Sequence, residues 1–461
     1  MNEKKKLEKK SIYSRCADSR PNDDCNDIVV CEILSRLPVK SLMRFKCVCK
    51  HWRDLIQEDP YFIDLQLTRS KTRPGLFIVI PLQASLKAGM ICGLQGYTKG
   101  GRCKKVPDQE LYLRAQLLGG PHQVRAAIND VMQTKSFSEY NEILPPINGL
   151  ICMVDSKVHY RVRIYNPSAR EITPWMKSTL LMNQQEGDRF DVFNDDMFPT
   201  YQFGFDPATK DYKVLCVWST NREEVSEVLT VGQTKWRRVR DEIPSNNFYD
   251  GNSVYANGCI YWIVYECLTV FDVGNEKFRV IPVPNCISDQ PRDCGQNVEL
   301  LDDQVDGRAD LFRRMSVYEG REVGLLEMGG HVTVFRRMSD YTAKLWIFNE
   351  DTKENTSNEC WSELTIMLPF CWAGDGQCVY IHTVPGTDEI IFETYRDCLD
   401  RRIEYASLYS YNWKKKIFTE LKLSGIPSSV PEYRASLFST FFESLVPIQK
   451  AGEAGITFGR K

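Results

Sequence analysis

Residues 36–52 read RLPVKSLMRFKCVCKHW, a stretch in which apolar and basic residues interleave and two cysteines stand one residue apart. At about 100° per residue, its large apolar groups share one side of a helix and its basic groups the other. The apolar side holds Leu42, Phe45, Val48, Cys49 and Trp52, and the basic side holds Lys40, Arg44, Lys46 and Lys50. The pattern predicts an amphipathic helix, either continuous or broken near Cys49 and Lys50.

Such a helix could bind a metal, a nucleic acid or another protein. The order of its residues favours one of these ligands over the others. Cys47 and Cys49 lie about 200° apart on a helix, and no pair of histidines adjoins them, so they are predicted to pack as small apolar residues without a metal. The basic side is predicted to be solvated, because the chain as a whole has a net charge of −2. Contact with DNA phosphate is the alternative that this disfavours. A basic side that complements an acidic partner protein is a further interpretation.

Short helices are predicted on both sides of this stretch, and together they form a helical head. Before it, apolar residues recur at helical spacing up to Leu37, where the following Pro38 ends the helix. After it, Asp59 suits the N-cap of a helix and Pro60 its first position. The head is expected to end near Leu67.

The head is too small to be self-sufficient. Three or four helices in about 45 residues bury little apolar surface, so a partner or the following domain is expected to complete the core. Residues 1–24, which are polar and rich in lysine, are predicted to be a disordered basic tail.

Beyond residue 70 the sequence changes to short apolar runs separated by polar turns, which predicts an all-β region. Several runs have the form of a hairpin whose return strand opens on an aromatic or apolar residue, as in LTVFDVGNEKFRVIPVP. The aromatic residues Trp236, Phe278, Trp361 and Phe418 recur loosely at one or two multiples of the roughly 40 to 50 residues of a propeller blade. A β-propeller is therefore predicted, with a β-sandwich as the alternative. Residues 83–110 and 285–310 are predicted to be long loops.

The propeller prediction gives a structural role to two pairs of turn residues and to four core residues. Asn166-Pro167 and Asp206-Pro207 are expected to initiate turns after strands. Four tryptophans are expected to fill the core between blades; they are Trp236, Trp262, Trp346 and Trp361.

Other kinds of function find little support in the sequence. The 17 cysteines have no regular spacing and no C-x-x-C, so neither disulfides nor a zinc site are predicted. The segments DDQVDGRAD (302–310) and GLQGYTKGGRCKK (93–105) lack the residues that a calcium loop or a phosphate loop requires. No hydrolase motif occurs, and no apolar run approaches the length of a membrane span. We expect a non-enzymatic, intracellular protein of the cytoplasm, the nucleus or both, without cofactor, metal, nucleic acid or membrane.

The stretch RLPVKSLMRFKCVCKHWRDLI resembles the F-box of plant proteins that also carry an F-box-associated, kelch-like β domain. Further blocks resemble that domain, in the same order: NGLICM (148–153), IYNPSAREI (164–172), YQFGFDPATKDYKVL (201–215), VYANGCIYWIV (254–264), VFDVGNEKFRVIPVP (270–284) and FESLVPI (442–448). The resemblance implies a small all-α F-box at 25–67, of three to four short helices, and a large all-β, kelch-like propeller at 68–448. Residues 449–461 are expected to be a flexible C-terminal tail.

The resemblance also implies a function. Such proteins are the substrate-recognition subunits of SCF-type cullin-RING ubiquitin ligases: the F-box docks on a Skp adaptor, which leads to the cullin and RING subunits, and the β domain binds the target protein. The matching positions, expected to dock on the adaptor or to fill the F-box core, are Ile33, Leu34, Leu37, Pro38, Val39, Leu42, Phe45, Cys47, Val48, Cys49 and Trp52.

One position departs from the family pattern. The usual Leu-Pro at the start of the F-box falls on Cys25-Asn26. Loss of an aliphatic contact of roughly 1.5 to 3 kcal/mol would weaken docking by one to two decades. The alternative function is therefore an F-box-like protein that acts outside a ligase, as a module that binds a protein or a glycan.

Overall fold

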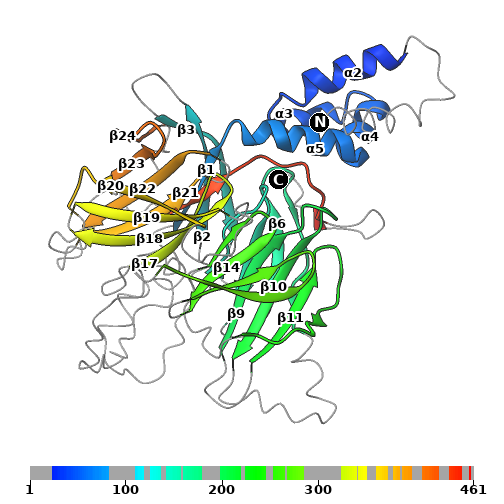
Figure 1. Cartoon of the computed structure of the whole chain (residues 1–461). Coiled ribbons are helices and arrows are strands. Elements are labelled where there is room, and N and C mark those ends of the chain that lie inside the picture. Colours follow the sequence, from blue (N-terminus) through cyan, green and yellow to red (C-terminus); the bar gives the residue numbers. More distant parts are fainter. Residues whose placement is uncertain are drawn as a thin grey trace, which may run out of the picture.

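In the part of the chain that the structure describes, helices come first and every later element is a strand. The computed structural model describes residues 23–81, 109–118, 125–135, 142–156, 159–178, 198–219, 224–244, 253–264, 267–284, 323–339, 341–349, 360–371, 377–384, 387–396, 407–424, 436–448 and 456–457. The helices in this part are α2 (Asp23–Leu34), α3 (Val39–Phe45), α4 (Lys50–Glu58) and α5 (Pro60–Lys71). They lie together at one end of the β domain (Figure 1). The helical head thus extends a few residues beyond both predicted ends, 25 and 67.

Two helix starts follow from their capping residues. The Asp59 carboxylate accepts a hydrogen bond from the Phe62 amide at 2.9 Å, and Pro60 occupies the first turn of α5, as predicted. Cys49 takes an extended conformation (φ −155°) before α4, where its sulfur accepts a hydrogen bond from the Trp52 amide at 3.4 Å. The predicted amphipathic helix is therefore broken between Phe45 and Lys50.

The break changes which side chains share a surface. Because α3 ends at Phe45, the continuous helical wheel does not apply to Val48, which lies in the connecting turn. Val48 is 62% exposed, although the wheel places it on the side of the buried Leu42.

The strands form six sheets in the described part of the chain. Five of the sheets follow one another along the chain. The first contains β4 (Glu142–Ile143), β5 (Ile151–Asp155), β6 (Arg161–Asn166), β7 (Glu171–Ile172) and β8 (Met176–Lys177). The second contains β9 (Phe198–Phe205), β10 (Tyr212–Ser219), β11 (Glu224–Thr230) and β12 (Arg237–Arg238), and the third contains β13 (Ser253–Ala256), β14 (Cys259–Val264), β15 (Cys267–Asp272) and β16 (Lys277–Pro282). The fourth sheet contains β17 (Val323–Met328), β18 (His331–Ser339), β19 (Thr342–Phe348) and β20 (Trp361–Met367). The fifth contains β21 (Gln377–Thr383), β22 (Glu389–Arg396), β23 (Ser407–Asn412) and β24 (Ile417–Glu420).

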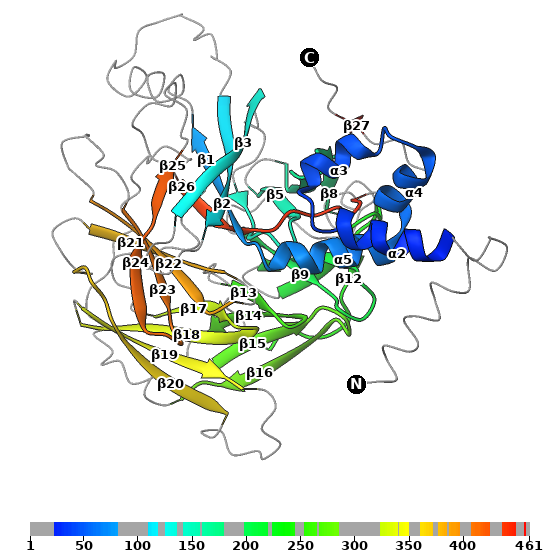
Figure 2. The same ribbon diagram turned by 90° about the horizontal axis from the view of Figure 1, so that it is seen from above.

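The last sheet joins the two ends of the β domain. It pairs β1 (Gly75–Pro81), β2 (Gln109–Leu118) and β3 (Arg125–Lys135) with β25 (Lys422–Ser424) and β26 (Ser436–Phe441). The inner strands β9, β13, β17, β21 and β26 contact one another in succession, and the sheets surround a common axis in Figure 2. The β domain is therefore a β-propeller, as predicted, and the sandwich alternative is not supported.

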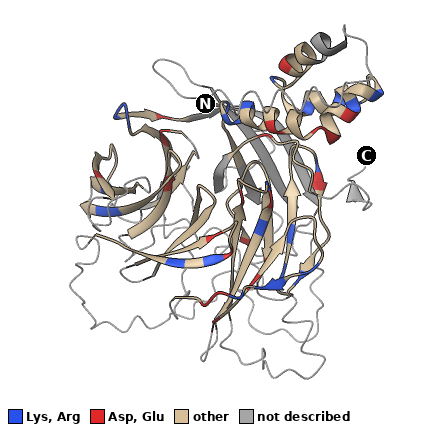
Figure 3. Ribbon diagram, turned by 45° about the vertical axis from the view of Figure 1, so that its right-hand side comes forward, with Lys and Arg blue, Asp and Glu red and all other residues tan. Residues whose placement is uncertain are grey.

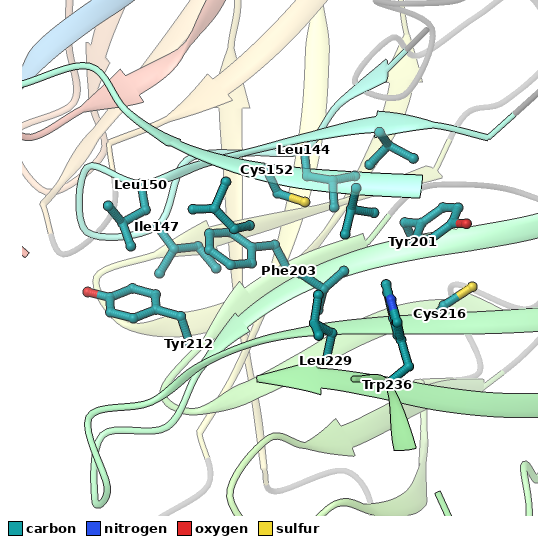
Figure 4. Packing of buried hydrophobic residues seen from close by; sticks show 14 of the residues in the cluster. Leu144, Ile147, Leu150, Cys152, Tyr201, Phe203, Tyr212, Cys216, Leu229 and Trp236 are labelled. Carbon is teal, nitrogen blue, oxygen red and sulfur yellow. The ribbon is translucent and has the colours of Figure 1, made fainter. Parts of the chain in front are cut away.

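Apolar side chains fill the spaces between neighbouring sheets. One cluster joins the sheet of β4–β8 to that of β9–β12, with Cys152, Tyr201 and Trp236 among its members (Figure 4). Trp262 and Trp346 are buried between other sheets, as predicted, while Trp361 is half-buried against Phe348.

The predicted turn residues act through their side chains. Asn166 accepts hydrogen bonds from the amides of Ser168 and Ala169 at 3.0 and 3.1 Å, and Asp206 accepts one from the Ala208 amide at 2.9 Å. Each fixes the turn after its strand, which agrees with the prediction.

Some predictions lie partly or wholly outside the described residues. These are the loops 83–110 (of which Gln109 and Glu110 begin β2) and 285–310, and the tail 1–24 up to α2. Within the predicted C-terminal tail, β27 (Ile456–Thr457) pairs antiparallel with β7.

A charged network joins two neighbouring sheets and predicts a pH effect on stability. The buried Lys213 donates to the Glu276 carboxylate and the Val273 carbonyl, both at 2.7 Å, and Arg237 also pairs with Glu276. Burial raises the pKa of Glu276, but the hydrogen bonds and charges of Arg237 and Lys213 outweigh it and hold that pKa below its ordinary value of 4.5. Ionised Glu276 therefore stabilises the fold above about pH 4.5, and this contribution is lost as pH falls through the lowered pKa.

Glu276→Gln should reveal this contribution, because the amide keeps the size of the side chain and removes the charge beside Lys213. We expect the variant to be less stable than the wild type at pH 7, with a difference in unfolding free energy that shrinks below about pH 4. Chemical denaturation of both proteins across this range measures the difference. Glu363→Gln is the control, since Glu363 pairs with Lys344 at the surface and its loss should change stability by less than about 1 kcal/mol. A difference for Glu276→Gln that is independent of pH would contradict the prediction.

Candidate protein-docking site on the helical head

The structure divides the residues predicted for docking by their exposure. Ile33, Pro38, Cys47, Val48 and Cys49 are exposed, and Leu37, Phe45 and Trp52 are half-buried. Leu34, Val39 and Leu42 are buried. The buried residues can act only through the fold of the head, so a partner would contact the exposed ones.

The buried residues form the core of the head. Leu34, Val39 and Leu42 pack with Ile56 of α4 and Phe62 of α5. Phe45 and Trp52 cover this core, with ring centroids 5.6 Å apart. The side chains of α3 and α4 that the helical wheel places on one side therefore lie close together in the structure. Most of them pack in or on the head core and do not form an exposed surface.

The outer side of α2 was predicted only in part, because Ile33 was among the predicted docking residues and Ile28 and Val29 were not. Its inner side, with Val30, Cys31 and Leu34, packs on the head core. Its outer side exposes Ile28 (47%), Val29 (55%) and Ile33 (58%). A helix that is apolar on both sides is normally covered on both.

These exposed residues of α2 and the exposed Val48, in the turn before α4, are the candidate docking residues. We call Ile28, Val29, Ile33 and Val48 the exposed apolar surface. A signal for it was present in the sequence, because Val29 and Ile33 stand four residues apart and so share a side of the helix. The sequence could not show that Val29 and Ile33 are the exposed pair, because Val30 and Leu34 have the same spacing and face the head core.

Arginines fix the position of α2 on α5. Arg69 donates to the Glu32 carbonyl at 2.6 Å and to the Glu32 carboxylate, and Arg73 donates to the Arg36 carbonyl at 2.7 Å. The hydrogen bond from Arg69 is the main reason that the pKa of Glu32 lies below its ordinary value. The exposed apolar surface therefore stands on a helix that is held by both packing and charge.

The predicted basic side is not one surface. Lys40, Arg44 and Lys50 are exposed, whereas Lys46 is half-buried and faces Glu171 of the propeller. Burial lowers the pKa of Lys46, and the Glu171 carboxylate opposes that shift. Blue and red residues are interspersed along the helices in Figure 3, which fits a solvated surface better than a binding site for phosphate.

A C-terminal segment of the propeller completes the head. Leu445 is buried in the head core, and the Glu443 carboxylate accepts a hydrogen bond from the Val39 amide at 2.9 Å, at the start of α3. We call residues 442–448 the clasp; it runs between the helices and the propeller (red in Figures 1 and 2). The expectation that the following domain or a partner completes the head is thus met by the following domain.

The clasp is also fixed to the propeller. The buried Asn166 donates through Nδ2 to the carbonyls of Ser444 and Val446, at 3.1 and 2.9 Å. The Ser444 amide donates to Ser168 Oγ at 3.2 Å. Gly149 (φ +81°) lies so close that a Cβ on it would come within 2.3 Å of the Phe442 carbonyl oxygen, so only glycine fits there. The head is therefore attached to the rigid turns of one propeller sheet.

The described part of the chain has neither a cluster of metal-ligand side chains nor a membrane-spanning helix at this site. In the described ranges, no three His, Cys, Asp or Glu side chains are placed to share a metal ion. None of the helices that the structure describes is both long and apolar enough to cross a membrane.

Comparisons with known proteins agree with this arrangement. A family model described as an F-box associated beta propeller domain matches residues 121–445, and one described as an F-box domain matches residues 21–64. A putative F-box protein of Arabidopsis thaliana is 30% identical over 268 residues, which are 56% of this chain and 59% of that protein. A second one is 28% identical over 62% of this chain and 65% of its own length. An F-box/LRR-repeat protein of the same plant is 23% identical over 87% of this chain and 81% of its own length. The matches thus span less than two thirds of the first two relatives.

Proposed function

Because the chain belongs to the family of F-box proteins with an F-box associated β-propeller domain, we propose that it is the substrate-recognition subunit of an SCF-type ubiquitin ligase. The head would dock on a Skp adaptor, and through it on cullin and RING subunits, while the propeller binds the target protein. The ligase chemistry would belong to the other subunits.

The observation that carries this proposal is the exposed apolar surface on α2 and the turn before α4. Its four aliphatic residues have no covering element in the described part of the chain, and each is about half exposed or more. Burying one such side chain contributes roughly 1.5 to 3 kcal/mol, so a partner over all four could bind tightly. Exposed aliphatic side chains gathered on one helix, as Ile28, Val29 and Ile33 are on α2, are typical of protein interaction sites.

The clasp gives this surface a fixed position relative to the propeller. Such a connection suits a receptor, because a target held by the propeller would then be presented at a constant distance from the ligase. We place the protein in the cytoplasm, the nucleus or both. No disulfide joins the cysteines for which the structure gives a state, as is usual in reducing compartments.

Co-expression tests the proposal directly. The full chain should co-purify with a Skp adaptor, and after expression in plant cells the same preparation should contain a cullin. A well-folded chain that captures neither protein would overturn the proposal.

A second function is favoured by Cys25-Asn26. Helix α2 begins at Asp23 and continues through these two positions, where the family's usual Leu-Pro would stand. A protein without that anchor could act outside a ligase as a protein- or glycan-binding module. Stable capture of a target without any Skp adaptor or cullin would favour this alternative.

A further inference from the structure

The outermost strands of the propeller sheets differ in how much backbone they offer to another strand. A strand at the edge of a sheet carries unpaired N–H and C=O groups, and natural proteins usually keep such strands short, cover them or interrupt them with proline. In the described part of the chain, the outermost strands β12, β25 and β27 have only two or three residues, and β24 has four. The longer ones are β16 with six residues and β20 with seven.

The outer edge of β16 is largely blocked. The Phe278 amide donates to the Asp241 carboxylate at 2.6 Å, so it is not available to another strand. Because alternate residues direct their peptide groups to the same edge, Val280 and Pro282 share that edge with Phe278. Proline has no N–H group, so only the Val280 amide is left to pair with a partner.

The outer edge of β20 is regular, as its hydrogen bonds with β19 show. Just beyond one end of the strand, the Leu368 amide donates to the Tyr341 carbonyl at 2.8 Å. Just beyond the other end, the Asn349 amide donates to the Cys360 carbonyl at 2.7 Å, and the register between these ends has no shift. Bonded and non-bonded pairs alternate in an antiparallel ladder, so the odd-numbered residues of β20 direct their N–H and C=O groups away from β19. They are Trp361, Glu363, Thr365 and Met367.

These four residues form an open backbone edge. Among the described residues, none makes a hydrogen bond to their outward N–H and C=O groups. β20 lies at the outside of the propeller in Figures 1 and 2. Alternate residues of a strand are roughly 7 Å apart, and an extended peptide offers its own donors and acceptors at the same interval. The open edge is therefore shaped to accept another strand.

The side chains of β20 indicate the composition of such a strand. On one side of the sheet, Leu364 and Ile366 belong to the apolar cluster shared with the sheet of β21–β24, and Leu364 is only half-buried. On the other side, Met367 is 65% exposed. The single charged residue of β20, Glu363, pairs with Lys344 at 2.6 Å. An uncharged segment with β-branched residues would fit these neighbours on both sides.

We propose that the open edge of β20 binds an extended, uncharged segment of the target protein, rich in Val, Ile and Thr, which adds to the sheet as a further strand. This inference rests on the proposed function and specifies it: it identifies the kind of target segment and the part of the propeller that holds it. Backbone hydrogen bonds would supply the affinity, and the side chains beside β20 would supply the selectivity.

A fluorescent peptide with the core Val-Thr-Val-Thr-Val, flanked by lysines for solubility, tests this with the full chain. Fluorescence anisotropy should show binding that Thr365→Pro weakens about tenfold or more, because proline removes an outward N–H. The fold should tolerate this proline, since no hydrogen bond to β19 is lost. Thr365→Ala is the matched control; it keeps the N–H and should bind the peptide like the wild type. The same peptide with every core amide N-methylated has the same charge and should not bind.

Hydrogen exchange gives a second measurement that needs no variant. The peptide should slow exchange of the Glu363, Thr365 and Met367 amides in the wild type and leave the amides of β16 unchanged. Unchanged exchange at these three amides would overturn the inference, as would absence of peptide binding or equal binding of the N-methylated peptide.

Two further outcomes separate the inference from its alternatives. Self-association of the wild type that Thr365→Pro abolishes would show that the open edge holds a second copy of the chain, which would also overturn the inference. Thr365→Pro should capture a Skp adaptor as the wild type does, because β20 lies outside the head. Failure of the wild type to capture the adaptor would count against the proposed function alone.

Discussion

Replacing both Ile33 and Val48 by aspartate is expected to reduce capture of a Skp adaptor at least 100-fold. These side chains are 58% and 62% exposed, on α2 and in the turn before α4. Each would lose an aliphatic contact of roughly 1.5 to 3 kcal/mol and would place a carboxylate in an apolar interface. Because neither side chain belongs to the head core, the free energy of unfolding should change by less than about 0.5 kcal/mol for each substitution.

The measurement is adaptor binding by the purified chain, with thermal unfolding of the same samples. Met338→Asp with Met367→Asp is the matched control, since these propeller residues are 49% and 65% exposed. It makes the same change in charge and should leave adaptor binding unchanged. Undiminished binding by a well-folded Ile33→Asp, Val48→Asp variant would show that the adaptor does not use this surface.

Residues of the half-buried class would give a less direct test. Leu37 and Trp52 pack on the head core, and Trp52 also contacts the Phe45 ring. Their substitution would alter the fold of the head together with its surface. Loss of adaptor binding in such a variant would therefore not distinguish a contact from a packing residue.

Local signals in the sequence predicted much of this fold. Asp59-Pro60 marks the start of α5 because an N-cap and a first-turn proline act within a few residues. Asn166 and Asp206 mark turns for the same reason. The alternation of apolar residues located the hairpins, and their aromatic residues indicated a propeller. Each of these features depends on neighbours in sequence.

The candidate site was only partly predictable, and α2 shows why. Val29 and Ile33 have the same spacing and chemistry as Val30 and Leu34, so periodicity could not say which pair faces the core. The break after α3 had a further effect: it moved Val48 from the predicted apolar side into an exposed turn. Which side a residue faces was decided by packing of four helices, which no single helix encodes.

No local pattern in the sequence could predict that the clasp contacts the helical head. Val39 and Glu443 lie 404 residues apart, and their hydrogen bond exists only because the propeller closes and returns the chain to the head. FESLVPI was recognised as a block of the β domain, but nothing in its sequence indicated that Leu445 belongs to the core of the other domain. The head is thus built from two distant parts of the chain.

This construction makes the head depend on Leu445. The side chain is buried among residues of the helical head, so Leu445→Ala would leave a cavity in the core that positions α3. Such a truncation costs about 2 to 5 kcal/mol, a large share of what a small helical unit can contribute on its own. The clasp backbone would remain attached to the propeller, because Asn166 and Ser168 hold it without the Leu445 side chain.

Leu445→Ala is therefore expected to loosen the head while the propeller stays folded, and to weaken adaptor binding at least tenfold. Hydrogen exchange should show faster exchange of the amides of α3 and α4 but unchanged protection of β9 and β10. Val446→Ala is the control, because Val446 is the next residue but packs on the propeller cluster; it should leave head exchange and adaptor binding unchanged. Equal protection of α3 in wild type and Leu445→Ala would mean that the head folds without the clasp. In that case the clasp would only join the two domains, and adaptor binding should survive the substitution.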